Sequence, residues 1–176
     1  VQDGCISTGN TTVMVAPNPN VNAGVDVSVC QNGSITLTAT GATTYSWSPG
    51  GQTTASITVS PASTLTYTVT GTSSNCVNSD DVMVTVNPLP LIDAGQDVSI
   101  CTGSSTTLIA NGGASYSWSP GGQSTQSISV SPATTTTYTV TGTALGCENT
   151  ANVTVTVLTT IPINAGPDVE ICVGAS

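Results

Sequence analysis

Apolar residues alternate with Ser and Thr along most of the chain, which predicts β-strands rather than helices. Every second position is apolar in the stretches 27–29, 35–39, 45–47, 57–59, 65–69 and 82–86. Turn-forming Gly, Pro and Asn lie between these stretches, as in Gln31-Asn32-Gly33 and Pro49-Gly50-Gly51. The pattern predicts six or seven short antiparallel strands.

The same pattern occurs twice, because the chain contains a tandem repeat. The sequence Ala23-Gly24-Val25-Asp26 recurs from Ala94 and again from Ala165, a spacing of 71 residues. More than half of the positions are identical between the first copy and the second. We expect a segment of a longer array. Its parts are the last hairpin of a preceding repeat at 1–20, whole repeats at 21–91 and 92–162, and the start of a following repeat at 163–176.

Each whole repeat has a Trp between two Cys, with turn signals every 8–12 residues. This arrangement favours an all-β chain of tandem immunoglobulin-like antiparallel β-sandwich domains. Trp47 and Trp118 stand in alternating strands, so we expect both rings in the cores, together with Tyr67 and Tyr138. Stacking of the two Trp rings on sugars is the alternative.

The charged residues restrict the functions that the chain could have. The 176 residues include no Lys, Arg or His, and nine Asp and Glu give a net charge of −9. Nucleic acid and anionic membranes are bound through Lys and Arg, so both are excluded as partners, and no apolar run reaches the ~20 residues that span a bilayer. No His or Lys can act as a base or form a Schiff base, and no Arg can clamp a phosphate. We therefore predict that the protein is not an enzyme.

The cysteines also follow the repeat. Cys30 and Cys76 lie 46 residues apart, and the second copy keeps this spacing. We predict the disulfides Cys30–Cys76 and Cys101–Cys147, with partners outside this sequence for Cys5 and Cys172. A metal site is the alternative, but neither a CxxC motif nor a His favours it. Paired cysteines predict an oxidising, extracellular compartment.

Carboxylates supply the remaining candidate chemistry. The pair Asp80-Asp81 is replaced by Ala151-Asn152 in the second copy, which argues against a catalytic role. The motif Asn/Asp-Ala-Gly-x-Asp at the start of each repeat contains Asp26 and Asp97. We expect its Gly to adopt positive φ and its Asp to cap a turn. Calcium binding by these Asp is the alternative, and we predict no other cofactor.

Two further features concern the surface and the joints. Candidate glycosylation sequons begin at Asn10, Asn32 and Asn152. Prolines in the linkers 16–20, 87–91 and 160–163 hold the chain extended, so we predict a semi-rigid rod. The apolar linker residues are expected to be buried between neighbouring domains. They are Leu89, Leu91 and Ile92, with Val21 and Ile163 in the corresponding places.

The segment Asn164–Cys172 carries the sequence Asn-Ala-Gly-Pro-Asp-Val-Glu-Ile-Cys. Together with Tyr-Ser-Trp-Ser-Pro, Ser-Ile-Thr-Val-Ser-Pro and Thr-Tyr-Thr-Val-Thr-Gly-Thr, it resembles the immunoglobulin-like and PKD-like repeats of large bacterial surface proteins. These include gliding-motility adhesins and other cargo of the type nine secretion system. The resemblance implies an extracellular stalk or filament segment on the bacterial cell surface, which spaces and stiffens an adhesin-like protein.

The partners implied are neighbouring repeats, with surface glycans bound through parts of the protein outside this sequence. Two alternatives remain open. One is a carbohydrate-binding accessory module of a secreted glycoside-degrading enzyme, which needs exposed aromatic rings. The other is a subunit of a non-covalently assembled surface fibre.

Overall fold

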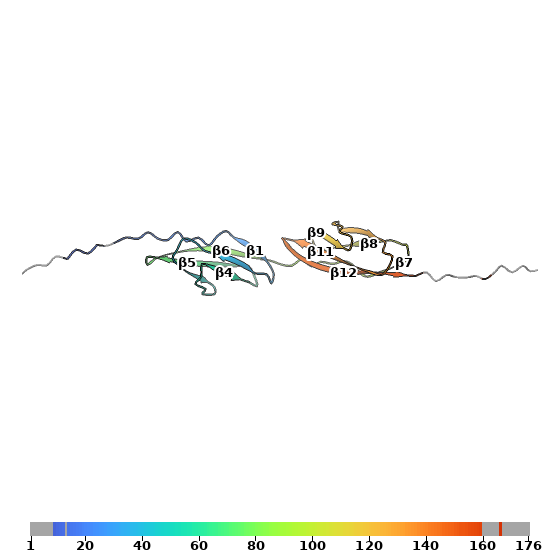
Figure 1. The fold of residues 1–176 in the computed structure, drawn as a ribbon, viewed down its shortest axis with the longest axis horizontal. Helices are drawn as coiled ribbons and strands as arrows, with labels where there is room; N and C mark the ends of the chain where they lie inside the picture. Colours follow the sequence, from blue (N-terminus) through green and yellow to red (C-terminus); the bar gives the residue numbers. More distant parts are fainter. Residues whose placement is uncertain (1–8, 13, 160–165, 167–176) are drawn as a thin grey trace, which may run out of the picture. The chain divides into compact units, whose positions relative to one another are not determined.

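The computed structural model describes residues 9–12, 14–159 and 166. The chain forms two compact units, Val1–Pro88 (unit 1) and Leu89–Ser176 (unit 2), and each contains one set of strands (Figure 1). Every element of regular secondary structure in the described residues is a β-strand. In unit 1 they are β1 (Val27–Cys30), β2 (Ile35–Thr38), β3 (Thr44–Ser48), β4 (Ser56–Val59), β5 (Leu65–Ser73) and β6 (Cys76–Asn87). In unit 2 they are β7 (Val98–Cys101), β8 (Thr106–Ile109), β9 (Ser115–Ser119), β10 (Ser127–Val130), β11 (Thr136–Ala144) and β12 (Cys147–Leu158).

Each unit consists of two sheets. In unit 1 a four-stranded sheet has the order β1-β6-β5-β3, and β2 pairs with β4 in a second sheet. Unit 2 repeats this topology with β7-β12-β11-β9 and β8-β10. The separation of β2 and β4 from β3, β5 and β6 matches the division of strands B and E from C, F and G in immunoglobulin domains. The chain is therefore an all-β tandem of immunoglobulin-like domains.

The expectation of wholly antiparallel sheets is wrong at one edge. Strand β1 runs parallel to β6, with Val27 opposite Val84 and Cys30 opposite Asn87. Strand β7 pairs with β12 in the same way. The first strand therefore extends the sheet that holds the last strand, and it ends at the same pole of the domain as β6.

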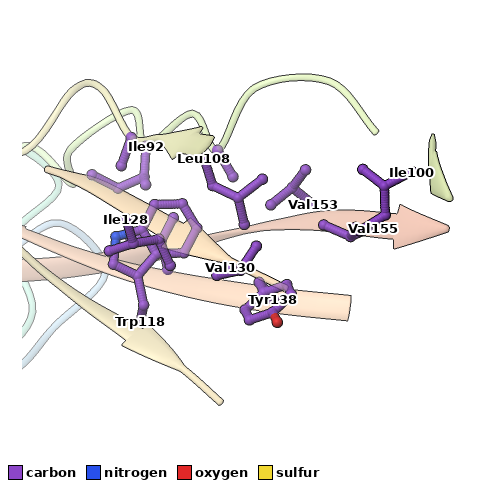
Figure 2. Close-up of a cluster of buried hydrophobic side chains, with 12 residues drawn as sticks. Ile92, Ile100, Leu108, Trp118, Ile128, Val130, Tyr138, Val153 and Val155 are labelled. Carbon is purple, nitrogen blue, oxygen red and sulfur yellow. The ribbon is translucent and has the colours of Figure 1, made fainter. Parts of the chain in front are cut away.

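The alternation of apolar and polar residues along the strands determines which side chains form the core. Both sheets of unit 1 contribute to one cluster of buried residues, which includes Leu37 from β2, Ile57 from β4 and Trp47 from β3. Figure 2 shows the equivalent cluster of unit 2, with Ile92, Ile128 and Trp118 toward one end and Ile100 and Val155 toward the other. Thr and Ser on the alternate positions face outward, so a chain without Phe can still fill a sandwich with Val, Ile, Leu and Trp.

Part of the expected preceding hairpin lies outside the described residues. Residues 9–12 and 14–20 are described, and they contain no strand. The expected repeat start at 163–176 lies outside the described residues except for Gly166.

Candidate functional site

Several of the carboxylates that the sequence singles out accept hydrogen bonds from backbone N–H groups of their own domain. No group of three or more His, Cys, Asp or Glu that could hold a metal ion occurs among the described residues. Of the pair Asp80-Asp81, the Asp80 carboxylate accepts a hydrogen bond from the Ala23 backbone N–H at 2.8 Å. Asp81 is exposed on β6. The pair therefore does not form a dyad directed at a common atom.

Asp26 and Asp97 connect the start of each domain to its last strand. Oδ1 of Asp26 accepts a hydrogen bond from the Met83 N–H at 2.9 Å, and Oδ1 of Asp97 accepts one from the Thr154 N–H at 2.7 Å. The expectation that these Asp cap their own turn is wrong. The preceding polar residue of the motif makes that local bond, since Oδ1 of Asn22 accepts from the Gly24 N–H at 2.7 Å.

Unit 2 repeats the local turn with a different residue. Oδ1 of Asp93 accepts a hydrogen bond from the Gly95 N–H at 2.9 Å. Gly24 and Gly95 have φ of 91° and 79°, as expected for this motif. Asn and Asp are thus interchangeable here because either side chain offers the accepting oxygen. The later Asp of the motif has a different role, because it accepts a hydrogen bond from the last strand of the domain.

The segment that leads into each domain is fixed by an Asn that the sequence analysis missed. Nδ2 of Asn78 donates a hydrogen bond to the Pro19 carbonyl oxygen at 3.0 Å, and Nδ2 of Asn149 donates one to the Pro90 carbonyl oxygen at 3.0 Å. Pro19 and Pro90 are both buried. The signal was present in the sequence, because Asn78 and Asn149 occupy the same position of the repeat within otherwise variable hairpins.

A glycine on the fifth strand of each domain contacts the residue two positions after the buried proline, which is Val21 in unit 1 and Ile92 in unit 2. A Cβ on Gly142 would overlap the side chain of Ile92, and a Cβ on Gly71 would overlap that of Val21. Ile92 and Val21 are buried, and both belong to the core of their own unit. The absent Cβ therefore creates the space that anchors the leading segment to its domain.

Leu89 and Leu91 do not belong to the core of their own unit. The side chain of Leu91 is 87% exposed, and that of Leu89 is 38% exposed. The extended chain places alternate residues on opposite faces, so Pro90 and Ile92 face the core while Leu89 and Leu91 face away from it. Ile163, which corresponds to Val21 and Ile92 in the repeat, lies outside the described residues.

The predicted disulfide pairs are not formed. Cys76 and Cys101 are free thiols, whereas Cys30 and Cys147 are disulfide-bonded. The reason is geometric, because Cys30 ends β1 opposite Asn87, at the far end of β6 from Cys76. Eleven steps along a strand cover roughly 36 Å, while a disulfide needs Cα atoms within about 7 Å. Cys5 and Cys172 lie outside the described residues.

The second repeat has the same geometry. Cys101 lies opposite Leu158 at the end of β12, and Cys147 begins that strand. The equal spacing of 46 residues in the two copies thus reflects a repeated position at each pole, and not a bond between the two poles of one domain.

Both Trp rings lie in the cores. Trp47 and Trp118 are 1% exposed, and their Nε1–H groups donate to the carbonyl oxygens of Thr54 and Thr125, both at 3.0 Å. Tyr67 and Tyr138 are buried beside them in the same clusters. Neither indole presents a face or an N–H that a sugar could contact.

The remaining candidate features lie on the surface. The sequon residues Asn10, Asn32 and Asn152 are exposed, and Asn32 has a left-handed φ of 65° in the turn after β1. A hollow of about 460 Å³ in unit 1 is lined by Gln31, Ala62, Ser63, Thr64, Val86 and Pro88, none of which ionises. Among the described residues, no helix has the length and apolar character needed to cross a membrane.

Comparisons with known proteins bear on the fold alone. The sequence matches no protein-family profile and no curated protein. Among solved structures, the chain is similar to the titin I-band fragment I67-I69, with a TM-score of 0.48 and 13% identity over 82% of this chain and 67% of that chain. Extracellular domains 3-5 of Drosophila OTK give a TM-score of 0.46 and 11% identity over 81% of this chain and 61% of that chain.

Proposed function

We propose that this chain is a structural segment of an extracellular surface protein, in which tandem immunoglobulin-like domains act as spacers. The observation that carries the proposal is the equivalence of the two domains. Each has the same Trp bond, the same Asp bond to the last strand and the same Asn bond to the leading segment, one period apart. A binding or catalytic domain requires a group that distinguishes it, whereas a spacer requires only that each copy fold identically.

The ionic and redox properties support an extracellular location. Disulfide-bonded Cys30 and Cys147 need an oxidising compartment. A net charge of −9 with no cation keeps an extended array soluble and makes it repel anionic surfaces. The resemblance of the repeats to those of bacterial surface proteins supports a stalk that holds an adhesive part of the protein away from the cell.

A carbohydrate-binding module needs exposed aromatic rings, and the burial of both Trp rings counts against this alternative. Trp47 and Trp118 have 1% of their surface exposed. The assembled-fibre alternative differs from the stalk only in how successive domains are joined, and it shares the role of spacer.

A domain exchange tests the proposal. Residues 21–91 are replaced by a second copy of 92–162, and the product is compared with the original chain by thermal unfolding and by small-angle X-ray scattering. Equivalent spacers predict an unchanged maximum dimension and folded domains in both proteins. A glycan array is then probed with both chains. Binding by the original chain that the exchange abolishes would show that the first domain has a specific ligand and would overturn the spacer role.

A further inference from the structure

A small hollow in unit 2 contains a hydroxyl that has no partner among the described residues. The hollow has a volume of about 280 Å³, and its lining includes Pro120, Gln123, Ser129, Ser131, Pro132 and Tyr138. Tyr138 is 7% exposed, and its hydroxyl forms no hydrogen bond with the described residues. No fully buried side-chain N or O atom of those residues lacks a partner, so this hydroxyl must reach the solvent. We call the site the Tyr138 hollow.

The Tyr138 hollow lies between the two sheets of unit 2. Val130 belongs to β10 and Tyr138 belongs to β11, and these two strands are in different sheets. Figure 2 shows the hydroxyl oxygen of Tyr138 at the outer margin of the core cluster. The ring of Tyr138 therefore fills the core, while its hydroxyl is available to a ligand.

The loop after β9 holds the side-chain amide of Gln123 in place. The Trp118 N–H donates to the Gln123 carbonyl oxygen, and the Gly122 N–H donates to the Trp118 carbonyl oxygen, both at 2.8 Å. A Cβ on Gly121, whose φ is 116°, would overlap the Gln123 side chain. The glycine thus leaves the space in which the amide lies, so this side of the hollow needs no ligand to form.

The polar groups of the Tyr138 hollow favour an uncharged ligand. The hydroxyls of Ser129, Ser131 and Tyr138 and the amide of Gln123 can all donate and accept hydrogen bonds. None of the lining residues is charged at neutral pH. A charged group that entered the hollow would lose water without gaining an opposite charge, which is unfavourable.

The strand beside the hollow has an open edge. Among the described strands, β10 pairs only with β8. The other edge of β10 therefore carries backbone N–H and C=O groups that an added strand can pair with. Strand β10 has no Pro and no charge that would oppose such pairing. We propose that the Tyr138 hollow binds an uncharged peptide in extended conformation, which adds to this edge and hydrogen-bonds Tyr138 and Gln123.

A peptide fits this combination of groups better than a sugar does. Each peptide group has one N–H donor and one C=O acceptor, which match both the Gln123 amide and the open edge of β10. A saccharide can bond the hydroxyls and the amide, but it has no backbone that repeats like a β-strand. The strand edge therefore decides the class of ligand.

The first repeat carries the same residues one period earlier. They are Pro49, Gln52, Ser60, Pro61 and Tyr67, and Tyr67 is 6% exposed. A Cβ on Gly50 would overlap the Gln52 side chain, as at Gly121 in unit 2. Each domain therefore offers one such site, which goes beyond the spacer role and does not depend on it.

An NMR titration of the ¹⁵N-labelled 176-residue chain tests the proposal. The probe is the blocked peptide Ser-Ile-Ser-Val-Ser, which is uncharged and repeats residues 127–131. We expect its addition to shift the backbone amide signals of residues 121–123 and 129–131. An analogue with Pro in place of Ile and Val lacks two N–H donors and should bind about tenfold more weakly. Shifts caused by maltose but not by the peptide, or no shifts with either, would overturn the proposal.

Two matched Tyr variants separate binding from stability. Tyr138→Phe keeps the ring in the core and removes the hydroxyl, so the peptide affinity of unit 2 should fall about fivefold while the melting temperature stays unchanged. The signals of unit 1 in the same sample are the internal reference. Tyr116→Phe removes a hydroxyl that bonds Gly113, so it should lower the melting temperature and leave the affinity unchanged. Equal affinity of unit 2 in Tyr138→Phe and in the original chain would contradict the assignment.

Discussion

The side-chain amide of Asn149 donates a hydrogen bond to the carbonyl oxygen of Pro90, 59 residues earlier in the chain, at 3.0 Å. The same bond joins Asn78 to Pro19 in the preceding domain. It fixes the proline segment to the hairpin at the end of the sandwich. The linker is therefore part of the domain that follows it.

Removal of this bond should loosen the leading segment. Asn149→Ala leaves the buried carbonyl of Pro90 without its partner, so we expect the free energy of unfolding of unit 2 to fall by about 1 kcal/mol. Urea denaturation measures the change. Asn152→Ala, at an exposed position of the same strand, is the control and should be close to neutral. Equal effects of the two substitutions would argue against a role for the Pro90 bond.

The contact between Gly142 and Ile92 predicts a coupled pair of substitutions. Gly142→Ala places a Cβ where the Ile92 side chain lies, and such overpacking should cost about 1–3 kcal/mol. Ile92→Val removes a methyl group and restores part of the space. A double-mutant cycle in urea should therefore give a smaller loss for the double variant than the sum of the single losses. Strict additivity would show that the two residues do not compete for the same space.

The Asp97 bond predicts the response to calcium. Asp97→Ala should destabilise unit 2 by about 1 kcal/mol, because the N–H of Thr154 loses its acceptor. Asp97→Asn retains an accepting oxygen and should lose less. Since the Asp97 carboxylate already bonds the backbone, addition of EDTA should leave the melting temperature of the original chain unchanged. A fall in melting temperature that Asp97→Asn abolishes would instead identify a calcium ligand.

The charge of the chain predicts its solubility. The net charge is −9 at pH 7, and the isoelectric point is about 4.1. As the pH falls, the carboxylates take up protons and mutual repulsion between chains declines. Light scattering should therefore rise as the pH approaches 4.1 and should fall again on return to neutral pH. A flat trace from about pH 7 to pH 4 would contradict this origin of solubility.

The strands and the core could be predicted from the sequence because they follow a local rule. Alternation with period two requires no knowledge of distant contacts, and Trp47 and Trp118 lie on the inward positions of their strands. The turn at Gly24 and Gly95 was equally local.

The disulfides were mispredicted because pairing depends on where strands end. The equal spacing of Cys30 from Cys76 and of Cys101 from Cys147 suggested a bond within each repeat. The parallel pairing of β1 with β6 places them at opposite poles, and no local pattern reveals it. The bond between Asp26 and Met83 joins residues 57 positions apart and was missed for the same reason.

The role of these equivalent domains as spacers is tested most directly by the length of defined arrays. Chains of two, four and six repeats, built from residues 21–162, are compared by small-angle X-ray scattering at neutral pH. The account predicts that the maximum dimension increases by the same amount with each added pair of repeats. A maximum dimension that levels off as repeats are added would contradict it, because a chain that folds back on itself cannot hold two parts of a protein apart.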